Sequence, residues 1–389
     1  MRLSARPWIG TLPLMIRINV PNMGKEEIEA VASVLESGYM TQGPKATEFE
    51  NAIGNYISGS PGIATSSATT ALHLILETLG IGPGDEVIIP DFTFPATGNA
   101  IVQSGATPVI IDVNPDTFNL NPQNLEQAIS PRTKAIIPVH VFGLCADIDA
   151  IRNVVAKFHP IFIIEDAACA LGSKYFGRSA GTLGDFACFS FHPRKVITTG
   201  EGGMLMFQNN EFKSRARQLS THGGGKTSQT DPYLLFSTNG FNYRLSDINA
   251  AIGIEQLKKI NRILNSKFKL AQFYIERLRN NEDISFQVVP EGYVHNFQSF
   301  VIKIRHGIDR DWVIRQLFEF GIESTLGTYS LSLQPSFQKW VSFATPVGQS
   351  LHHSTLTLPL FEGLTFENIE YICNKLESIL RNNSAPLNR

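Results

Sequence analysis

The sequence has little net charge and no long apolar run. Its 33 lysine and arginine residues nearly balance 35 aspartate and glutamate residues, which gives a net charge of −2. Such a chain lacks the basic footprint of a nucleic-acid-binding protein and the polybasic patch of a membrane-surface protein. No stretch approaches the roughly 20 apolar residues of a membrane span. We therefore expect a soluble cytoplasmic protein without nucleic-acid or membrane partners.

Cysteine is also scarce, and no metal-binding pattern is present. The four cysteines, Cys145, Cys169, Cys188 and Cys373, form no CxxC pair, so they are typical of reduced thiols in a cytosolic protein. The absence of HExxH and of His/Cys clusters with metal-ligand spacing predicts no metal. The glycine-rich stretch GIGPGDE follows a predicted helix instead of a strand, which disfavours a nicotinamide enzyme.

The first 14 residues differ from the rest of the chain. Pro7 and Pro13 interrupt their apolar patch, and no small-residue cleavage site follows, so the pattern does not indicate a signal peptide. Met15 is itself a plausible chain start. We expect residues 1–14 to be an N-terminal extension, either a leader or a start-site artefact.

Apolar runs and amphipathic stretches alternate over the first 250 residues, in a chain long enough for two or three domains. The runs predict strands, and the amphipathic stretches predict helices. Alternation of this kind favours an α/β fold with a mostly parallel sheet covered by helices. The expected strands are Glu86–Pro90, Thr107–Asp112, Lys134–Val139, Ile161–Glu165, Phe186–Phe191 and Gly203–Phe207, and the expected helices are Thr69–Leu79, Pro95–Gln103, Pro122–Ile129 and Asp147–Phe158.

The pattern changes after Asp247. A long helix is predicted over Ile248–Arg279, and a strand and two helices follow at Phe297–Ile304, Asp311–Phe320 and Phe366–Leu380. We expect a large domain over residues 15–250 and a small C-terminal α/β domain over residues 251–389. The polar segment from Thr221 to Thr238 has no core signal and is predicted to be a mobile loop.

Two charged side chains lie where parallel-sheet proteins bind ligands. Lys195 lies in FSFHPRKVITTGEGG, between a strand and a glycine-rich stretch. Its amine could form a Schiff base with a carbonyl cofactor, although an exposed loop lysine is the alternative. Glu165 and Asp166 follow a buried strand. Asp166 could keep a pyridine nitrogen protonated, or it could cap a helix.

Further candidates lie at the ends of other predicted elements. Ser66 and Ser67 precede a helix that opens at 68–70, where backbone N–H groups bind phosphate or an ordinary cap forms. Ser190 could add a hydroxyl to the same phosphate. Either Phe92 or Phe94 could stack on a flat cofactor, with core packing as the alternative. The turn at 242–244 is a further candidate, with a polar helix entry as the alternative, whereas His140 is interpreted as a satisfied core histidine.

Six segments occur together in one order: SSATTALHL, GDEVIIPDFTFPAT, TKAIIPVHVFG, IIEDAACALGS, GTLGDFACFSFHPRKVITTGEGGM and GFNYRLSDINAAIGIEQL. In that order they resemble the DegT-type (DegT/StrS) sugar aminotransferases, which are fold-type-I pyridoxal-phosphate enzymes. The likeness covers most of Met15 to Leu380 and is far more specific than any single motif. It implies an aspartate-aminotransferase-like fold and pyridoxal 5'-phosphate as the cofactor.

The resemblance also implies a role for individual residues. Lys195 matches the catalytic lysine that binds the cofactor covalently, Asp166 the acid that faces the pyridine nitrogen, and Phe94 the aromatic residue that stacks on the ring.

The phosphate is implied to have its own set of residues. Thr69 and the neighbouring Ala68 backbone match the phosphate-binding turn, and Ser190 matches a serine that reaches the same phosphate. Asn242 matches an asparagine that reaches the phosphate of the neighbouring subunit's cofactor. The family therefore implies a homodimer with shared active sites.

The sequence departs from the family at two places. Cys169, a weak hydrogen-bonding residue, stands where members commonly carry Gln or His near the cofactor's phenolic oxygen, so tuning of the cofactor is expected to differ. The stretch GIESTLGTYSLSLQP after residue 321 lacks a histidine that members often have there, which leaves Tyr329 as a candidate for substrate contact.

The function implied is transfer of an amino group from an amino acid, glutamate being expected, to a nucleotide-linked keto-sugar. The run ITTGEGG resembles that of members that aminate C4 of the sugar, so we expect amination at C4. Polysaccharide biosynthesis is one pathway in which such an amino sugar would be used. The alternatives are a sugar dehydratase, whose members have histidine at the position of Lys195, an aminotransferase acting on a cyclitol or aminobenzoate precursor, and an idle cofactor-binding regulator.

Overall fold

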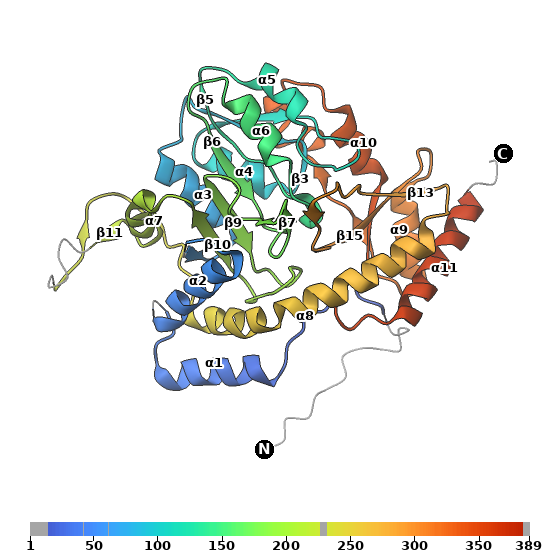
Figure 1. Cartoon of the computed structure of the whole chain (residues 1–389), viewed down its shortest axis with the longest axis horizontal. Helices are drawn as coiled ribbons and strands as arrows, with labels where there is room; N and C mark the ends of the chain where they lie inside the picture. Colours follow the sequence, from blue (N-terminus) through green and yellow to red (C-terminus); the bar gives the residue numbers. More distant parts are fainter. Residues whose placement is uncertain (1–14, 42, 61, 226–231, 384–389) are drawn as a thin grey trace.

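The computed structural model describes residues 15–41, 43–60, 62–225 and 232–383, so the predicted N-terminal extension lies outside the described residues. Two sheets of unequal size are surrounded by helices, and one long helix runs past both parts (Figure 1). Among the described helices, none combines the length and the apolar composition needed to cross a membrane.

The larger sheet has seven strands in the order β1, β10, β9, β6, β5, β2, β4. The pairs from β9 to β4 are parallel, whereas β10 pairs antiparallel with both of its neighbours. This arrangement confirms the expected mostly parallel sheet. The strands are β1 (Ile63–Thr65), β2 (Glu86–Pro90), β4 (Thr107–Ile111), β5 (Thr133–Ile136), β6 (Phe162–Asp166), β9 (Phe186–Ser190) and β10 (Gly203–Phe207).

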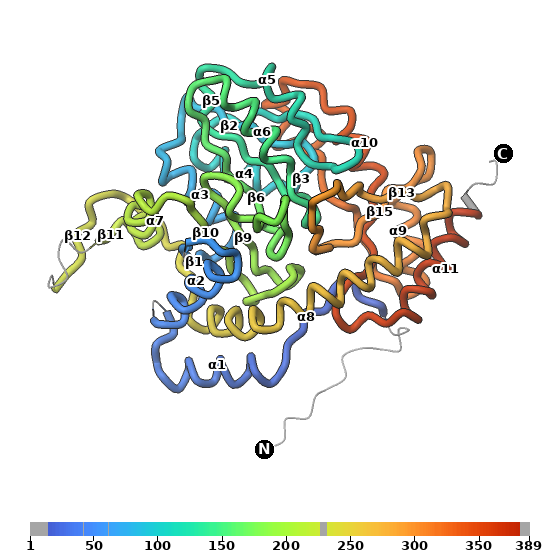
Figure 2. Tube along the Cα trace, viewed as in Figure 1, coloured from blue at the N-terminus to red at the C-terminus, as the bar shows by residue number. Residues whose placement is uncertain are grey.

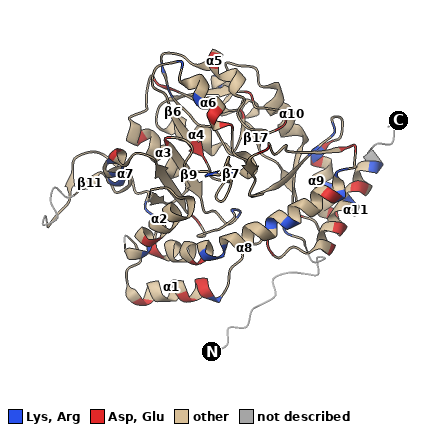
Figure 3. Ribbon diagram, in the orientation of Figure 1, with Lys and Arg blue, Asp and Glu red and all other residues tan. Residues whose placement is uncertain are grey.

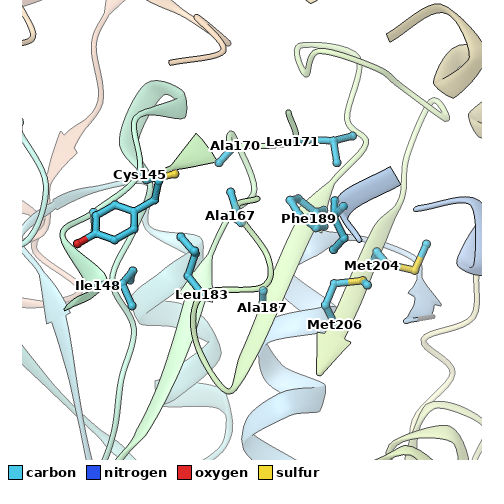
Figure 4. Close-up of a cluster of buried hydrophobic side chains, with 14 of the residues drawn as sticks. Cys145, Ile148, Ala167, Ala170, Leu171, Leu183, Ala187, Phe189, Met204 and Met206 are labelled. Atoms are coloured by element: carbon cyan, nitrogen blue, oxygen red, sulfur yellow. The ribbon is translucent and has the colours of Figure 1, made fainter. Parts of the chain in front are cut away.

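Burial on both faces explains the continuous apolar runs of these strands. All five residues of β2 are buried. Ile88 belongs to one hydrophobic core and its neighbours Val87 and Ile89 to another, because successive side chains of a strand point to opposite faces. Figure 4 shows part of the core that contains Ile88, including Ala167 and Leu171 from the segment that follows β6.

Helices flank this sheet, and their first residues are set by local capping. Ser67 precedes the third helix, and its hydroxyl oxygen accepts a hydrogen bond from the backbone N–H of Thr70, a favoured cap. The helices before the long one are α1 (Lys25–Ser37), α2 (Pro44–Ile57), α3 (Ala68–Leu79), α4 (Ala96–Gln103), α5 (Leu125–Ala128), α6 (Ile148–Val155) and α7 (Lys213–Ser220).

The smaller sheet is antiparallel and has the order β13, β15, β18, β16. The N-terminal segment joins this part of the chain, because Ile16 forms a parallel bridge with Ile322. The elements are β13 (Ile284–Phe286), β15 (Phe300–Ile304), β16 (Thr325–Leu326), β18 (Thr355–Leu358), α9 (Arg310–Glu319), α10 (Pro346–Ser354) and α11 (Phe366–Asn383).

The long helix α8 (Asp247–Leu278) links the two parts and confirms the predicted bridge helix. It packs against α1 and α2 and further along against α11, as the trace in Figure 2 shows. On α8, Lys259 forms ion pairs with Glu26 and Glu27 of α1, where acidic residues are visible in Figure 3. Because α8 continues through residue 250, the domain boundary placed there stays a prediction.

Two expectations about local structure were wrong, and a third segment contains short strands that the sequence did not indicate. Pro122–Ile129 is a 3₁₀ turn followed by the four-residue α5. The strand expected from Phe297 begins only at β15, because Phe297 has a φ of 48°, which is incompatible with a strand. The segment Thr221–Thr238 contains two short paired strands, β11 (Gly224–Gly225) and β12 (Leu235–Phe236), which project on the left of Figure 1.

The structure also contains short ladders that no sequence pattern indicated. One joins β3 (Phe92–Thr93) to β17 (Tyr329–Ser330). Another joins β14 (Tyr293–Val294), β7 (Lys174–Tyr175) and β8 (Arg178–Ser179). The first ladder ties the end of β2 to the C-terminal part of the chain.

Candidate active site

A small pocket lies at the carboxyl ends of β6 and β9. These two strands pair in parallel, so the residues that follow them meet at one edge of the sheet, where ligands bind in α/β folds. The lining of this pocket includes Cys169, Ser190, Lys195 and Gln298. Three of these four were candidates from the sequence, whereas Gln298 comes from a segment that no motif marked.

Lys195 is half-buried in this pocket. Its position is fixed by a turn in which the backbone N–H of Lys195 donates to the carbonyl of His192 at 2.8 Å. The side-chain Nζ lies 3.0 Å from Sγ of Cys169 and donates a hydrogen bond to it. The amine therefore lies next to Cys169, the position that the sequence analysis marked as a departure from the family that the chain resembles.

Asp166, the last residue of β6, is 7% exposed, and its carboxylate accepts three hydrogen bonds, one of them from the thiol of Cys188 to Oδ1 at 3.7 Å. Its Oδ2 atom accepts from the hydroxyl of Thr97 at 2.7 Å, and Oδ1 accepts from the backbone N–H of Ala168 at 3.2 Å. No helix begins after Asp166 in this described part of the chain, so the helix-cap interpretation was wrong. Thr97, which lies at the start of α4, is a site residue that sequence reasoning missed.

Glu165 and Asp166 have different environments, since neighbouring strand residues point to opposite faces. Glu165 is fully buried and accepts hydrogen bonds from three backbone N–H groups within residues 181–184. Its Oε2 atom also lies 2.8 Å from Nε2 of His140. Because Nδ1 of His140 accepts from the N–H of Ala146, Nε2 carries the proton and donates to Glu165. His140 is confirmed as a satisfied core histidine.

The first turn of α3 has two free backbone donors. Ser67 caps the N–H of Thr70, whereas the N–H groups of Ala68 and Thr69 make no hydrogen bond to any described residue. Such N–H groups at a helix N-terminus bind anions well. Ala68 and Thr69 do not line the pocket that contains Lys195.

Gly203 connects this turn to Ser190. In the sheet, Gly203 of β10 is opposite Ser190 on one side and Thr65 on the other. A Cβ atom on Gly203 would lie 2.3 Å from the carbonyl carbon and oxygen of Ser67 and 2.5 Å from the nitrogen of Ala68. Only glycine permits this close approach, which brings Ser190 near the N-terminus of α3.

The two phenylalanines after β2 have different environments. Phe92 is buried in a hydrophobic core, whereas Phe94 is 64% exposed. The ring of Phe94 makes an edge contact with Tyr329, with 6.1 Å between the ring centroids. His352 of α10 lies at the same centroid distance from Tyr329. The stretch after residue 321 lacks the histidine that the resemblance implies there. The structure puts His352, a histidine from another segment, beside Tyr329 of that stretch.

Asn242 is exposed and does not line the pocket of Lys195. Its Oδ1 atom accepts a hydrogen bond from Nε of Arg244 at 2.9 Å. The turn that carries it is held to the N-terminal side of α3, because the backbone N–H of Ser66 donates to the carbonyl of Tyr243. The predicted phosphate turn and the Asn242 turn are thus neighbours within one chain.

Comparison with known proteins gives close agreement over nearly the whole chain. GDP-perosamine synthase of Caulobacter vibrioides is 36% identical over 369 residues, which cover 94% of this chain and 98% of that protein. The spore coat polysaccharide biosynthesis protein SpsC of Bacillus subtilis is 33% identical, with 93% and 96% covered.

The structure of Spr1654 from Streptococcus pneumoniae, described as its PLP-form, superposes with a TM-score of 0.89 at 30% identity and covers 95% of this chain and 99% of that chain. Its PMP-form gives the same TM-score. These similarities confirm the expected fold and agree with the expected cofactor. Residues 21–377 match a single family along their whole length. The chain belongs to the DegT/DnrJ/EryC1/StrS aminotransferase family.

Proposed function

We propose that this chain is a pyridoxal-phosphate-dependent aminotransferase that moves an amino group from glutamate to a nucleotide-linked keto-sugar. The observation that carries the proposal is the meeting of Lys195, Cys169 and Ser190 in one pocket beside the buried Asp166. The similarity to a GDP-perosamine synthase and to a polysaccharide biosynthesis protein supports a sugar-nucleotide acceptor.

The residues present fit the cofactor. Two unpartnered N–H groups of α3, from Ala68 and Thr69, would hold its phosphate together with the hydroxyl of Ser190. Asp166 would face the ring nitrogen, and the exposed ring of Phe94 would cover the ring face. When bound, pyridoxal phosphate supplies the carbonyl that takes up the amino group and the ring that withdraws electrons.

The proton transfers are assigned to Lys195. Its Nζ atom, released from the covalent linkage, would take a proton from the donor's α-carbon and deliver it within the same pocket. Cys169, 3.0 Å away, accepts only a weak hydrogen bond, so it would leave the amine free to move. A positioned base of this kind contributes about 10²- to 10⁴-fold to the rate. A dehydratase is disfavoured, because the lysine is present.

A second pocket supports an acidic donor such as glutamate. It shares Gln298 with the pocket of Lys195, and its lining includes Asn19, Arg194 and Thr325. The guanidinium of Arg194 makes no hydrogen bond or ion pair to any described residue, so it could bind a carboxylate. We expect Arg194→Gln to raise the KM for glutamate and Arg194→Lys to restore part of the affinity.

A homodimer is part of the proposal, with Asn242 reaching the phosphate of the cofactor bound to the partner. Its support is an exposed apolar stretch at and beside β12, in which Tyr233 is 72% and Phe236 is 61% exposed. Light scattering should give twice the mass of one chain. We expect Leu235→Ser with Phe236→Ser to weaken the dimer, whereas Phe318→Ser, another exposed phenylalanine, should not.

The location and the position of amination are also proposals. The four cysteines are free thiols, as expected in the cytoplasm, where we place the protein. We keep amination at C4 as the expected regiochemistry on the basis of the ITTGEGG run. Product analysis by nuclear magnetic resonance would distinguish an amino group at C4 from one at C3.

The deciding experiment is the absorbance spectrum of the purified protein with pyridoxal phosphate, before and after glutamate is added. Conversion of the pyridoxal band to the pyridoxamine band supports the proposal. Lys195→Ala should abolish this conversion. Lys174→Ala, which replaces an exposed lysine and is the control, should convert as the parent does. Binding without conversion by any amino donor would indicate the idle-regulator alternative. A protein that never binds the cofactor would overturn the proposal.

A further inference from the structure

Lys267 of α8 is a buried amine without an acidic partner. Its residue is 2% exposed, and Nζ donates to two backbone carbonyls, that of Leu360 at 2.8 Å and that of Gln298 at 3.2 Å. It forms no ion pair with any described residue. Burying an amine without a counter-charge is costly, so its retention calls for an explanation beyond packing.

The two carbonyls belong to residues that line the second pocket described above, which adjoins the pocket of Lys195 through Gln298. Gln298 and Leu360 are both among the lining residues of the second pocket, together with Asn19 and Arg194. The ammonium thus joins the start of β15 to the segment after β18, two stretches that are about 60 residues apart in the sequence but adjacent at this site.

Each partner of Lys267 leads by further hydrogen bonds to the segment directly before Lys195. On one side, the side-chain amide of Gln298 donates to the carbonyl of Arg194 at 2.9 Å. On the other side, the N–H of Leu360 donates to the carbonyl of Ile18 at 3.1 Å.

The next residue of the N-terminal segment completes the second path. Nδ2 of Asn19 donates to the carbonyl of Pro193 at 2.9 Å. The two paths from Lys267 therefore converge on the consecutive residues Pro193 and Arg194, and the next residue is Lys195.

We propose that Lys267 is a positioning residue for Lys195: it holds the two hydrogen-bonded paths that fix the 193–194 backbone and thereby the direction in which the Lys195 amine projects. This inference rests on the proposed function, in which Lys195 carries the covalent and proton-transfer chemistry. Lys267 itself does not contact Lys195, and it reaches the pocket of Lys195 only through the carbonyl of Gln298.

The protonation of Lys267 is compatible with this role. Burial lowers the pKa of Lys267 to about 7. An ammonium has three N–H donors and a neutral amine has two, so either form can serve both carbonyls. The two hydrogen bonds from Lys267 therefore do not depend on the charge of its amine. A side chain that replaces Lys267 needs two N–H donors of similar reach to preserve them.

The test compares three variants of the holoenzyme. Lys267→Met keeps the length and apolar stem of the side chain but removes the donors, Lys267→Arg keeps donors, and Tyr274→Phe is the matched control. Tyr274 lies seven residues along the same helix and is equally buried, and its hydroxyl donates to the neighbouring carbonyl of Pro359 at 3.1 Å. It lies on neither path.

At saturating glutamate, we expect Lys267→Met to lower the rate at which the pyridoxal band changes to the pyridoxamine band by about 10- to 100-fold. Small misplacement of a reacting group lowers reaction rates by factors of this order. The pH at which the absorbance of the bound cofactor changes should shift by at least about half a unit, which is a threefold change in the protonation constant of the Lys195 linkage. Lys267→Arg should restore both quantities to within about threefold, and Tyr274→Phe should change neither.

A different pattern would overturn the proposal. If Lys267→Met lowers only the melting temperature and leaves the absorbance curve and the glutamate rate as in the parent, Lys267 is purely structural. If Lys267→Met does not fold, Lys267→Leu, which also removes the donors, takes its place in the same comparison. Failure of the parent protein to convert with any donor would instead contradict the proposed function, and the absorbance comparison would still decide the role of Lys267.

Discussion

The amine of Lys195 and the thiol of Cys169 are hydrogen-bonded to each other at 3.0 Å. Lys195 follows β9 and Cys169 follows β6, so the contact joins the ends of two neighbouring parallel strands. A thiol is a weak partner in a hydrogen bond. The contact therefore orients the lysine without holding it strongly, which is compatible with the role proposed for Lys195.

Cys169 should be the most reactive thiol of the protein. It is half-buried, whereas Cys145, Cys188 and Cys373 are buried, and burial raises the pKa of Cys188 well above its usual value and that of Cys373 to about 12. Because the thiolate is the reactive form, iodoacetamide should label the native protein first at Cys169, as measured by peptide mass spectrometry. Cys169→Ser should remove this early label. Equal labelling of the three buried cysteines would contradict the prediction.

The hydroxyl of Thr97 should contribute to activity through Asp166. Its hydrogen bond to the carboxylate is 2.7 Å long and buried, and a bond to a charged group contributes about 1.5–3 kcal/mol. We expect Thr97→Val, which keeps the shape but removes the donor, to lower the rate of conversion by glutamate by roughly 10-fold or more. Thr97→Ser, which keeps the hydroxyl, should stay close to the parent. Equal rates for the two variants would show that the bond does not matter.

The sequence predicts the parallel strands well because their burial is encoded locally. The strands β2 and β9 show this most clearly, since their residues are almost all buried and their sequences are mainly apolar on both faces. Helix α1 has a weak pattern instead, since Glu27 and Val34 are its only buried residues. The paired strands β11 and β12 have two residues each, and β12 is exposed, so no core signal marks them.

The site divides in the same way. Asp166, Cys169, Ser190 and Lys195 lie within short motifs at strand ends, where local sequence is informative. Gln298 and Lys267 come from segments that only the tertiary fold brings to the site, and no spacing in the sequence connects them to Lys195. Glu165 was visible in the same motif as Asp166, but the local sequence does not show the three backbone donors from residues 181–184 that satisfy its buried carboxylate.

Gly203 should be required for binding the cofactor phosphate. In Gly203→Ala the new methyl group would meet Ser67 at 2.3 Å, and the backbone of the α3 N-terminus would have to shift. Since overpacking costs about 1–3 kcal/mol, we expect pyridoxal phosphate to bind roughly 10- to 100-fold more weakly, as measured by fluorescence titration. The control is Gly363→Ala, where the nearest atom to the new methyl lies 3.5 Å away. Unchanged affinity in Gly203→Ala would refute the close-approach argument.

His295 is held in its neutral form by the groups around it. Its Nδ1 atom accepts a hydrogen bond from the N–H of Phe297 at 2.7 Å, so the proton is on Nε2, which lies 3.0 Å from the side-chain oxygen of Gln287. Burial lowers the pKa of His295 to about 3. A second proton would have to be placed on Nδ1, directly against the N–H of Phe297.

The free energy of unfolding should therefore depend on pH through His295. The unfolded chain, with a histidine pKa of about 6.5, binds this proton between pH 6.5 and pH 3, whereas the folded protein does not. Since stability rises with pH wherever the unfolded state binds more protons, His295 stabilises the fold fully above pH 6.5 and progressively less as the pH falls towards 3. In urea titrations at pH 7, 6 and 5, His295→Gln, which cannot titrate, should lose less stability on acidification than the parent. The exposed-histidine control His306→Gln should follow the parent, and equal slopes for His295→Gln and the parent would contradict a neutral His295.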